Sequence, residues 1–523
     1  MARRPLGAQI SAMLASRGID TVFGIPGVHN IELYRGLEES GLRHILARHE
    51  QGAGFMADGY ARATGRPGVA YVITGPGLTN IMTPMGQAYS DSVPLLVISS
   101  CLDEAAATRG QLHQMRDQEA AARTVCDWSE TARTAEAAYA LIDRALTEFE
   151  TTRRRSRHIQ IPIGVLGKPA PPAPAQSSLT APDTISIEAA LRPIMAARRP
   201  LFIFGGGCRY AASDARRVVA KLGAATFLTY AGRGVIAPEY PLNFGSYLAR
   251  PDSVDAIASA DLVVAVGTEL SETDLWRAEL GHSGPLIRVD RDPGEMSDPG
   301  ALNIVCDAGA FLRKLLEMCE GHHADTGWRA KEVADARSRW RAASNAERPG
   351  IVAISDALRD CLPDDTMVFS DMTQFAYVAK EVWDMPAPGL WHHPCGFGTL
   401  GYALPAAIGG KVGVGGQPVV AIAGDYGFQY TLQELGTAAE LGLSLPILLW
   451  DNGMLKEIEA CMTGSQIAPV AVQALNPDFG TLAAAYGIGY AKPATLADLQ
   501  ARVGAALTAD MPTIIHMTPE ITG

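Results

Sequence analysis

Short apolar runs alternate with longer amphipathic stretches along this chain of 523 residues. The clearest runs are rich in valine, isoleucine and leucine and have the length of a β-strand; they cover residues 68–74, 94–99, 200–205, 261–267, 418–424 and 445–450. Continuous apolar runs of this length are typical of parallel strands that are covered on both faces. The alternation of strand and helix predicts an α/β protein, which we expect to form three consecutive doubly wound parallel-sheet domains.

Two segments of different composition divide the chain into blocks. Residues 167–178 are rich in proline, alanine and serine, a composition that is typical of linkers. Residues 321–349 form a charged helical stretch that ends in Glu-Arg-Pro-Gly. We therefore predict one domain in each of residues 1–170, 185–335 and 345–523.

A polar residue follows each of two neighbouring apolar runs in the third block. Asp425 directly follows one run, and Asn452 lies just beyond the next. Ligands of such sheets bind beyond the carboxyl ends of the strands, where we expect these two side chains to lie together. The oxygens of these two side chains suit Mg²⁺ bound to a diphosphate. Gly424 and Gly427 let the backbone approach a phosphate, and the N-terminus of a helix that begins after Gly427 favours an anion. The alternative interpretation is a helix-capping aspartate and an asparagine in a turn.

The first block places Glu50 at the start of a helix that is rich in small residues. Small residues permit close packing, so we expect this helix to lie at an interface. A carboxylate buried there would have a raised pKa and could share a proton with a ring nitrogen. The alternative interpretation is a glutamate that the helix dipole favours in the first turn.

Charge and cysteine content exclude several functions. The chain has 44 Lys and Arg against 56 Asp and Glu, a formal net charge of −12, which argues against nucleic-acid binding. The arginine run at 153–155 is interpreted as a solvated helix end or loop. The eight cysteines show no CxxC spacing, which is typical of reduced thiols in a cytoplasmic protein. The sequence has no apolar signal core and no apolar stretch of membrane-spanning length, so we expect no membrane partner.

Four motifs stand in a fixed order along the chain: His49 with Glu50, residues 57–62 (Ala-Asp-Gly-Tyr-Ala-Arg), residues 75–80 (Gly-Pro-Gly-Leu-Thr-Asn), and Gly424 and Asp425 with Asn452. In this order they resemble the thiamine diphosphate (ThDP)-dependent enzymes of the acetolactate synthase, benzaldehyde lyase and 2-oxo-acid decarboxylase group. The resemblance implies a pyrimidine-binding, a central and a diphosphate-binding domain. It also implies a cofactor bound between the first domain of one subunit and the third domain of its partner. The expected assembly is a homo-oligomer, with a dimer as the minimum and a tetramer as the common form.

The resemblance also implies a role for individual residues. Glu50 hydrogen-bonds the aminopyrimidine ring and favours the tautomer that takes up the thiazolium proton, so that the cofactor performs the carbanion chemistry. Asp425, Asn452 and the backbone carbonyl of Met454 hold Mg²⁺. Leu400 separates the two cofactor rings; the alternative interpretation is core packing, and both can hold at once. The cofactor contacts that we expect are Glu50, Thr79, Asn80, Gln374, Gly398, Leu400, Gly424, Tyr426, Gly427 and Met454.

Two histidines and two departures from the family pattern concern the substrate end of the site. His29 and His113 match family positions from which a side chain could relay protons or bind the substrate carboxylate, but a lone histidine is more often structural. Tyr426 stands where the family usually has glycine or alanine, and residues 454–458 lack the usual glycine and tyrosine. The glycines at 205–207 are a weak nucleotide signal, and we expect no FAD.

Finer similarity at residues 23–29, 267–270 and 424–431 resembles the branch of this group that decarboxylates 5-guanidino-2-oxopentanoate. We therefore expect non-oxidative decarboxylation of this 2-oxo acid to an aldehyde and CO₂. A guanidinium substrate requires a carboxylate, for which the candidates are Glu269, Glu272, Asp274 and Glu457. The first three are also well explained as ordinary loop and helix-capping residues. The alternative functions are a carboligase that makes acetolactate or an acyloin and, more remotely, a catalytically silent regulatory subunit.

Overall fold

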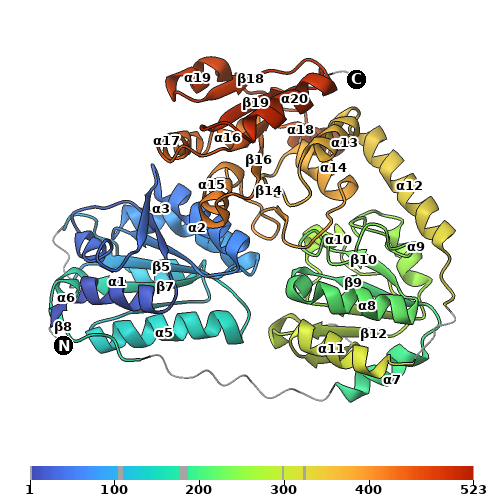
Figure 1. The fold of residues 1–523 in the computed structure, drawn as a ribbon, viewed down its shortest axis with the longest axis horizontal. Coiled ribbons are helices and arrows are strands. Elements are labelled where there is room, and N and C mark those ends of the chain that lie inside the picture. Colours follow the sequence, from blue (N-terminus) through green and yellow to red (C-terminus); the bar gives the residue numbers. More distant parts are fainter. Residues whose placement is uncertain (1–2, 104–109, 176–186, 297–299, 322–325, 522–523) are drawn as a thin grey trace.

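The computed structural model describes residues 3–103, 110–175, 187–296, 300–321 and 326–521. Three parallel β-sheets follow one another along the chain, each flanked by helices. In Figure 1 the N-terminal domain lies at the left in blue, the central domain at the right in green, and the C-terminal domain above both in orange and red. This architecture confirms the prediction of three doubly wound parallel-sheet domains.

The N-terminal domain is built on a six-stranded parallel sheet with the order β3-β2-β4-β5-β7-β6. Its strands are β2 (Thr21–Gly24), β3 (Arg43–Leu46), β4 (Gly68–Val72), β5 (Leu95–Cys101), β6 (Trp128–Thr131) and β7 (Arg157–Pro162). Its helices are α1 (Leu6–Ser16), α2 (Glu50–Thr64), α3 (Pro76–Ser90), α4 (Gln118–Arg123), α5 (Ala135–Thr151) and α6 (Ile163–Leu166). A short antiparallel pair, β1 (Arg4–Pro5) with β8 (Pro169–Ala170), joins the two ends of this domain.

The central domain has a five-stranded parallel sheet with the order β10-β9-β11-β12-β13. Its strands are β9 (Pro200–Phe204), β10 (Ala225–Leu228), β11 (Leu262–Val266), β12 (Leu286–Asp290) and β13 (Leu302–Val305). Its helices are α7 (Glu188–Ala196), α8 (Ala212–Leu222), α9 (Ser253–Ala258), α10 (Glu272–Leu275) and α11 (Ala308–Met318). The long helix α12 (Ala330–Glu347) then leads to the third domain, in the charged stretch that separates the predicted blocks.

The C-terminal domain repeats the plan with six parallel strands in the order β15-β14-β16-β17-β19-β18. Its strands are β14 (Met367–Ser370), β15 (Trp391–His392), β16 (Val419–Gly424), β17 (Pro446–Trp450), β18 (Gly489–Ala491) and β19 (Thr513–Met517). Its helices are α13 (Ile351–Cys361), α14 (Gln374–Val382), α15 (Ala403–Val414), α16 (Asp425–Phe428), α17 (Leu435–Glu440), α18 (Lys456–Gly464), α19 (Phe479–Ala485) and α20 (Leu496–Ala506).

All six apolar runs that stand out in the sequence form strands, and each of these strands is buried along its whole length. Burial on both faces explains why these strands lack alternating polar positions. The parallel register of β16 and β17 pairs Gly424 with Trp450, so the chain leaves both strands at one edge of the sheet. Among the described residues, no helix combines the length and the apolarity needed to cross a bilayer.

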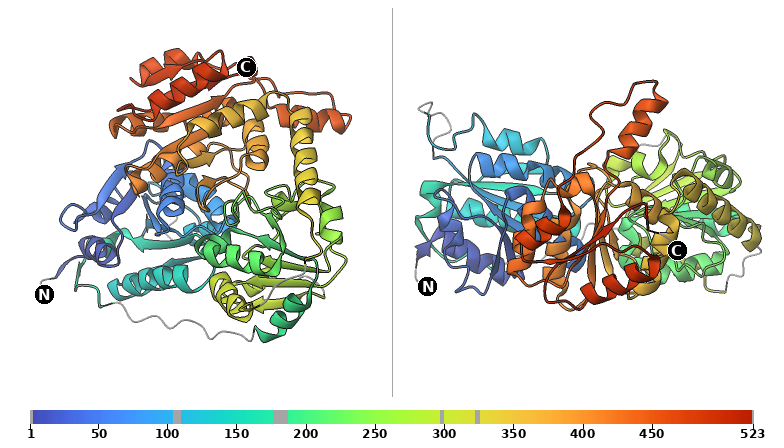
Figure 2. Two further views of the ribbon diagram at one scale, coloured as in Figure 1. Left: turned by 45° about the vertical axis from the view of Figure 1, so that its right-hand side comes forward. Right: turned by 90° about the horizontal axis from the view of Figure 1, so that it is seen from above.

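Helix α2 packs against α15 (Figures 1 and 2). This contact holds the N-terminal and C-terminal domains of one chain together. The two backbones nearly touch: a β-carbon at Gly59 would lie 2.0 Å from the carbonyl oxygen of Ala406. One at Gly409 would lie 1.8 Å from that of Met56. Because only glycine fits at such an approach, the small residues of α2 serve the interface that the sequence predicts.

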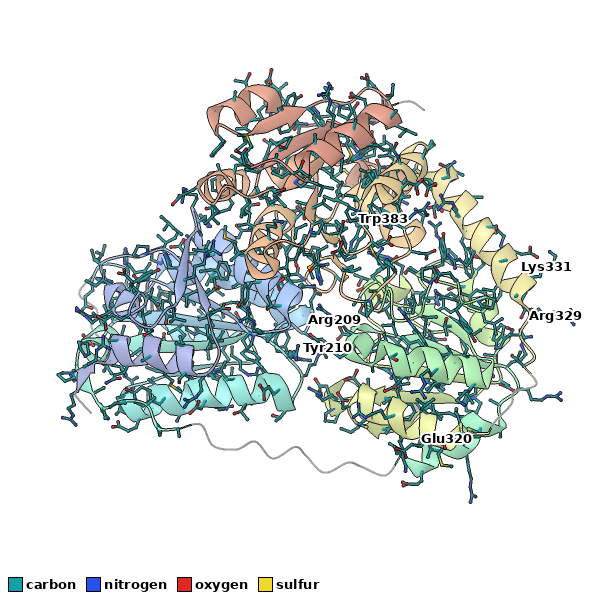
Figure 3. The ribbon with its side chains drawn as sticks, viewed as in Figure 1. Arg209, Tyr210, Glu320, Arg329, Lys331 and Trp383 are labelled. Atoms are coloured by element: carbon teal, nitrogen blue, oxygen red, sulfur yellow. The ribbon has the colours of Figure 1, made fainter. Side chains whose placement is uncertain are left out.

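The central domain contacts the end of α2 through two side chains that follow β9. Figure 3 shows Arg209 and Tyr210 between the N-terminal and central domains. An Nη atom of Arg209 donates to the carbonyl of Arg62 at 2.6 Å. The Tyr210 hydroxyl would lie 2.5 Å from a β-carbon at Gly65, the residue that ends α2 in a left-handed conformation. Helix α2 therefore touches all three domains.

Candidate active site

Asp425 and Asn452 meet at the edge of the C-terminal sheet, as the strand pattern predicts. The N–H of Gly453 donates to Oδ2 of Asp425 at 3.0 Å, and the N–H of Met454 donates to Oδ1 of Asn452 at 3.3 Å. The amide of Asn452 also donates to Oε1 of Gln374 at 3.3 Å. The structure thus gathers both predicted metal-binding side chains, Met454 and Gln374 in one loop cluster.

A short helical turn lies between the strand end at Gly424 and the helix that the sequence predicts after Gly427. The helix that we expect after Gly427 is present as a 3₁₀ turn at Leu432–Glu434 that continues into α17. The four-residue α16 precedes it and begins at Asp425, with the extended Gly424 as its cap. An acidic residue is favourable in a first helical turn, and Asp425 takes that place. The carboxylate that we assign to the metal therefore lies at the start of this short turn.

Asn476 is a component of this cluster that the sequence did not reveal. Its amide donates to Oδ2 of Asp425 at 2.7 Å and to Oδ1 of Asp451 at 2.9 Å. Burial and the neighbouring Asp451 raise the pKa of Asp425, whereas a hydrogen bond from His516 lowers the pKa of Asp451. Two carboxylates this close disfavour each other's charge, which a cation beside them would offset.

The donor set at this edge fits Mg²⁺. One carboxylate, one amide oxygen and a backbone carbonyl are hard oxygen ligands, and an ion held by so few protein groups keeps positions for phosphate oxygens. Among the described residues, no group of three or more His, Cys, Asp and Glu side chains could hold a metal ion.

The segment around Leu400 lies beside the same loop. Gly398 has a left-handed φ of 65°, and Cδ2 of Leu400 lies 3.4 Å from the position of a β-carbon at Gly427. The N–H of Gly401 donates to Oδ2 of Asp371 at 2.8 Å, and burial raises the pKa of this aspartate to about 6. Asp371 directly follows β14, so the strand-end rule that predicts Asp425 could have found it.

Glu50 and Asn80 form the corresponding cluster in the N-terminal domain. Glu50 is the first residue of α2, which the ring of His49 caps by accepting from the N–H of Gln51 at 3.1 Å. The amide of Asn80 donates to Oε2 of Glu50 at 3.0 Å. The side chain of Glu50 is partly buried. Thr79, the neighbouring candidate, is exposed, and its hydroxyl donates to Pro76 at 3.0 Å.

The structure brings His29 and His113 together. Their rings meet edge to face with centroids 5.0 Å apart, and each has a buried Nδ1 without a hydrogen-bond partner among the described residues. Burial, and next the charge of His113, lower the pKa of His29. A β-carbon at Gly75 would lie 2.5 Å from the carbonyl oxygen of His113, and one at Gly77 would lie 3.4 Å from Oε1 of Glu50. The histidine pair and Glu50 therefore both border the start of α3.

The two clusters lie on different sheets of one chain. Among the described residues, no hydrogen bond or ion pair joins Glu50, His29 or His113 to the loop of Asp425 and Asn452. The two clusters are therefore separate within this chain, and each is referred to as a half-site.

The acidic residues proposed for a guanidinium lie in two separate places. Oε2 of Glu269 binds Arg153 at 2.8 Å, and Asp274 accepts from the N–H of Tyr230 at 3.2 Å. Burial raises the pKa of Asp274 to about 6. Glu269 and Asp274 line a cavity of about 340 Å³ between the three domains, together with Gly206 and Gly207 of the glycine run, Arg62, Asp91, His392, His393 and Cys395.

Glu457, in contrast, lies near the metal loop. It is in the first turn of α18 and forms a two-point ion pair with Arg348, with N–O distances of 3.0 and 2.7 Å. Gln374, which contacts Asn452, also hydrogen-bonds Glu457. This is the geometry in which a carboxylate recognises a guanidinium, although here the guanidinium belongs to Arg348.

Glu434 is a buried carboxylate under the start of α2 that the sequence did not reveal. It accepts hydrogen bonds from the backbone N–H groups of Arg48 and His49 at 3.0 to 3.1 Å and from the hydroxyl of Thr437 at 3.0 Å. Burial raises its pKa to about 7, although these donors oppose the shift. The C-terminal domain thus fixes the residues that precede Glu50.

Replacing Glu434 by glutamine is expected to change how stability depends on pH. The folded protein holds the Glu434 proton more tightly than the unfolded chain. The contribution of this proton to the free energy of unfolding is therefore complete below about pH 4.5 and is lost as the pH rises through 7. Glutamine does not titrate, so the variant should gain up to about 3 kcal/mol relative to wild type between pH 5 and pH 8. Scanning calorimetry of both proteins across this range measures the difference.

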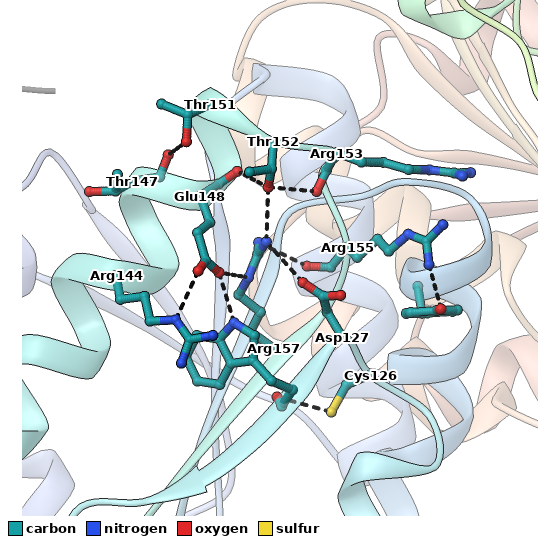
Figure 4. A network of polar contacts seen from close by, with 12 residues as sticks. Cys126, Asp127, Arg144, Thr147, Glu148, Thr151, Thr152, Arg153, Arg155 and Arg157 are labelled. Atoms are coloured by element: carbon teal, nitrogen blue, oxygen red, sulfur yellow. Dashed lines mark hydrogen bonds and ion pairs between the residues drawn. The ribbon is translucent and has the colours of Figure 1, made fainter. Parts of the chain in front are cut away.

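Glu148→Gln is the matched control for this measurement. Glu148 lies in the arginine-rich network of the N-terminal domain (Figure 4). Burial raises its pKa, but hydrogen bonds from Trp128 and Arg144 outweigh that effect and lower it below the ordinary value. Its substitution should therefore change stability equally at pH 5 and pH 8. An equal effect of Glu434→Gln at both pH values would show that Glu434 does not titrate in this range.

Comparisons with known proteins agree with this geometry. The model described as "Thiamine pyrophosphate enzyme, N-terminal TPP binding domain" matches residues 4–121, and those of the central domain and the C-terminal TPP binding domain match residues 187–315 and 371–517. The two domains that carry the half-sites are thus the two that match TPP-binding models.

Curated relatives match over most of the chain. The chain is 45% identical to a probable 2-ketoarginine decarboxylase, AruI, of Pseudomonas aeruginosa, over 98% of this chain and 93% of that protein. It is 30% identical to an acetolactate synthase of Mycobacterium bovis, over 86% of this chain and 76% of that protein. It is 28% identical to the acetolactate synthase isozyme 2 large subunit of Escherichia coli, over 98% of this chain and 95% of that protein. With its sheet order, its two half-sites and these matches, the chain belongs to the thiamine pyrophosphate enzyme family.

Proposed function

We propose that this chain is a ThDP- and Mg²⁺-dependent decarboxylase that converts 5-guanidino-2-oxopentanoate, or 2-ketoarginine, to CO₂ and the guanidino aldehyde. The observation that carries this proposal is the 45% identity, over nearly the whole chain, to a relative named as a 2-ketoarginine decarboxylase. The paired half-sites of Glu50 with Asn80 and of Asp425 with Asn452 support the cofactor assignment. Acetolactate synthases match with lower identity, so a carboligase is the second candidate.

Each half-site would contribute a separate function to the bound cofactor. When bound, ThDP supplies the carbon nucleophile for a 2-oxo group. Asp425, Asn452 and the Met454 carbonyl would hold Mg²⁺ at the diphosphate, with Gly424, Tyr426, Gly427 and Gln374 around it, and Gly398 and Leu400 would contact the rings. Glu50, held by Asn80, would accept and return a proton at the pyrimidine ring.

The histidine pair would act on the substrate. Because burial lowers the pKa of His29, its imidazole is neutral at pH 7 and can accept a proton or a hydrogen bond. The unpartnered Nδ1 atoms of His29 and His113 leave polar capacity that a substrate carboxylate or a water molecule would satisfy. We therefore propose that both side chains contact the substrate and move protons there.

A second copy of the chain would complete the site. Exposed apolar side chains border both half-sites: Val28, Ile31 and Leu112 near the histidines, and Ile458, Ile467, Val470 and Leu475 beyond Met454. Helix α18, which has no buried residue, projects from the C-terminal domain in the right-hand view of Figure 2. Apolar surfaces of this kind favour association. We propose that a dimer is the smallest active unit and a homotetramer the full assembly.

The cysteines suit the cytoplasmic location that we propose. All eight are free thiols, five of them buried. Burial raises the pKa of the Cys101 and Cys126 thiols to about 12, which keeps them unreactive.

Product analysis with parallel substrates tests the proposed reaction. We expect purified protein with Mg²⁺ and ThDP to release CO₂ from 5-guanidino-2-oxopentanoate faster than from pyruvate or benzoylformate, and the organic product to be the free aldehyde. Protein stripped of ThDP and assayed without it is the control. A condensed hydroxyketone product would instead identify a carboligase, and CO₂ release from pyruvate alone would contradict the guanidino substrate.

A further inference from the structure

The loop at residues 395–400, which contains Gly398 and Leu400, belongs to the C-terminal domain but is held by the N-terminal domain. Two successive backbone N–H groups of this loop donate to one carboxylate at the end of α3: that of Gly396 to Oδ1 of Asp91 at 2.7 Å, and that of Cys395 to Oδ2 at 3.2 Å. Backbone donors bound by a charged acceptor form strong hydrogen bonds. The start of the loop is therefore fixed by a side chain from another sheet.

Asp91 is itself fixed from two sides. Arg62 and Gln87 each donate to its Oδ2 at 2.7 Å. Arg62 also donates to the fully buried Asp58 at 2.7 Å, which accepts from the Tyr402 hydroxyl at 2.8 Å. The side chain of Asp91 is 6% exposed. A carboxylate with this many partners has little rotational freedom, so it defines the place of the N–H groups that it binds.

Close packing continues this contact along the loop. A β-carbon at Gly86 would lie 2.8 Å from the ring of Phe397, and one at Gly396 would lie 2.7 Å from Cβ of Ser90. Further on, the N–H of Thr399 approaches Oε1 of Gln87 at 3.4 Å. The loop therefore lies directly on the last two turns of α3, up to the residue that precedes Leu400.

The other end of α3 contacts Glu50 through Asn80. We propose that Asp91, supported by Arg62 and Gln87, is a positioning residue that sets the geometry of the ring-contacting loop, so that helix α3 links the positions of Glu50 and Leu400. The proposal rests on the proposed function in one respect, the contact of Gly398 and Leu400 with the cofactor. In the proposed dimer the two ends of α3 face different cofactors.

Hydrogen exchange in cofactor-free protein tests the positioning directly. In Asp91→Ala the amides of Cys395 and Gly396 lose their acceptor, and we expect them to exchange about ten-fold faster than in wild type. Asp91→Asn keeps one carbonyl oxygen and should show a smaller increase. Glu148→Gln is the control, because it disrupts a comparable carboxylate–arginine network of the N-terminal domain that does not touch the loop (Figure 4). Unchanged exchange in Asp91→Ala, or an equal increase in Glu148→Gln, would overturn the proposal.

Calorimetric titration with ThDP in excess Mg²⁺ gives a second readout. We expect the Kd of Asp91→Ala to rise about ten-fold and that of Glu148→Gln to stay within about two-fold of wild type. If Asp91→Ala does not fold, Gln87→Met serves instead, because it removes one support of Asp91 and the contact to Thr399. Unchanged hydrogen exchange and an unchanged Kd in Gln87→Met would then count against the proposal. If wild type fails to bind ThDP, the proposed function is wrong, whereas the exchange comparison still decides whether Asp91 positions the loop.

Discussion

Glu50→Gln is expected to lower the kcat for CO₂ release by about a thousand-fold while ThDP still binds, because a positioned proton carrier contributes about 10² to 10⁴ in rate. The glutamine carbonyl can accept the Asn80 hydrogen bond that Glu50 accepts at 3.0 Å, so the local structure should persist. The amide cannot take up a proton, however, and this separates the two roles of the side chain. Steady-state CO₂ release and calorimetric ThDP titration measure the two effects separately.

Two further variants define what this result means. Asn80→Ala removes the partner of Glu50 but leaves the carboxylate, and we expect a smaller loss of about ten-fold in kcat. Glu32→Gln removes a carboxylate on the same domain that pairs, within the described part of the chain, with Arg35 alone, and it should leave kcat unchanged. An active Glu50→Gln protein would refute the assignment of Glu50. Loss of ThDP binding with normal turnover at saturating cofactor would assign Glu50 to binding and not to proton transfer.

The C-terminal half-site was predictable because its residues follow strands. Asp425 and Asn452 each come after a continuous apolar run, and the parallel register of β16 and β17 places the ends of both runs at one edge. Such runs are visible in the sequence because burial on both faces leaves them no polar positions. The same rule would have identified Asp371 after β14. The cofactor, metal and catalytic roles of all the predicted site residues, Thr79, Gln374 and Tyr426 among them, stay predictions.

The residues that the sequence did not reveal act across domains. Glu434 binds the backbone of Arg48 and His49, which lie nearly four hundred positions away, and Asp91 binds Gly396. These contacts depend on how whole domains pack, and no local periodicity reports domain packing. The pairing of His29 with His113 lies within one domain and is hidden for a different reason, because the two residues belong to separate loops of one sheet. Local pattern therefore predicts each half-site, and domain packing decides what holds it.

Asp425→Asn is expected to weaken Mg²⁺-dependent ThDP binding by about 100-fold or more, because it removes the carboxylate of a site with few protein ligands. The same change should stabilise the cofactor-free protein. Asp425 is buried beside Asp451, and both carboxylates share the amide of Asn476. A neutral amide at position 425 relieves this repulsion and can donate to Asp451. We expect the cofactor-free Tm to rise by about 2 °C.

Thermal unfolding with and without ligand measures both effects. At a ThDP concentration of about 100 times the wild-type Kd, binding stabilises wild type by about 2.7 kcal/mol, and a 100-fold weaker variant by only about 0.4 kcal/mol. Asp451→Asn is the matched control, because it removes the neighbouring carboxylate, which pairs with His516 at 2.8 Å. This variant should have a lower cofactor-free Tm and keep most of the stabilisation that ThDP provides. If Asp425→Asn kept the full Mg²⁺-dependent gain, the metal would have to lie elsewhere; if it lowered the cofactor-free Tm, Asp425 would be a structural residue whose charge the fold requires.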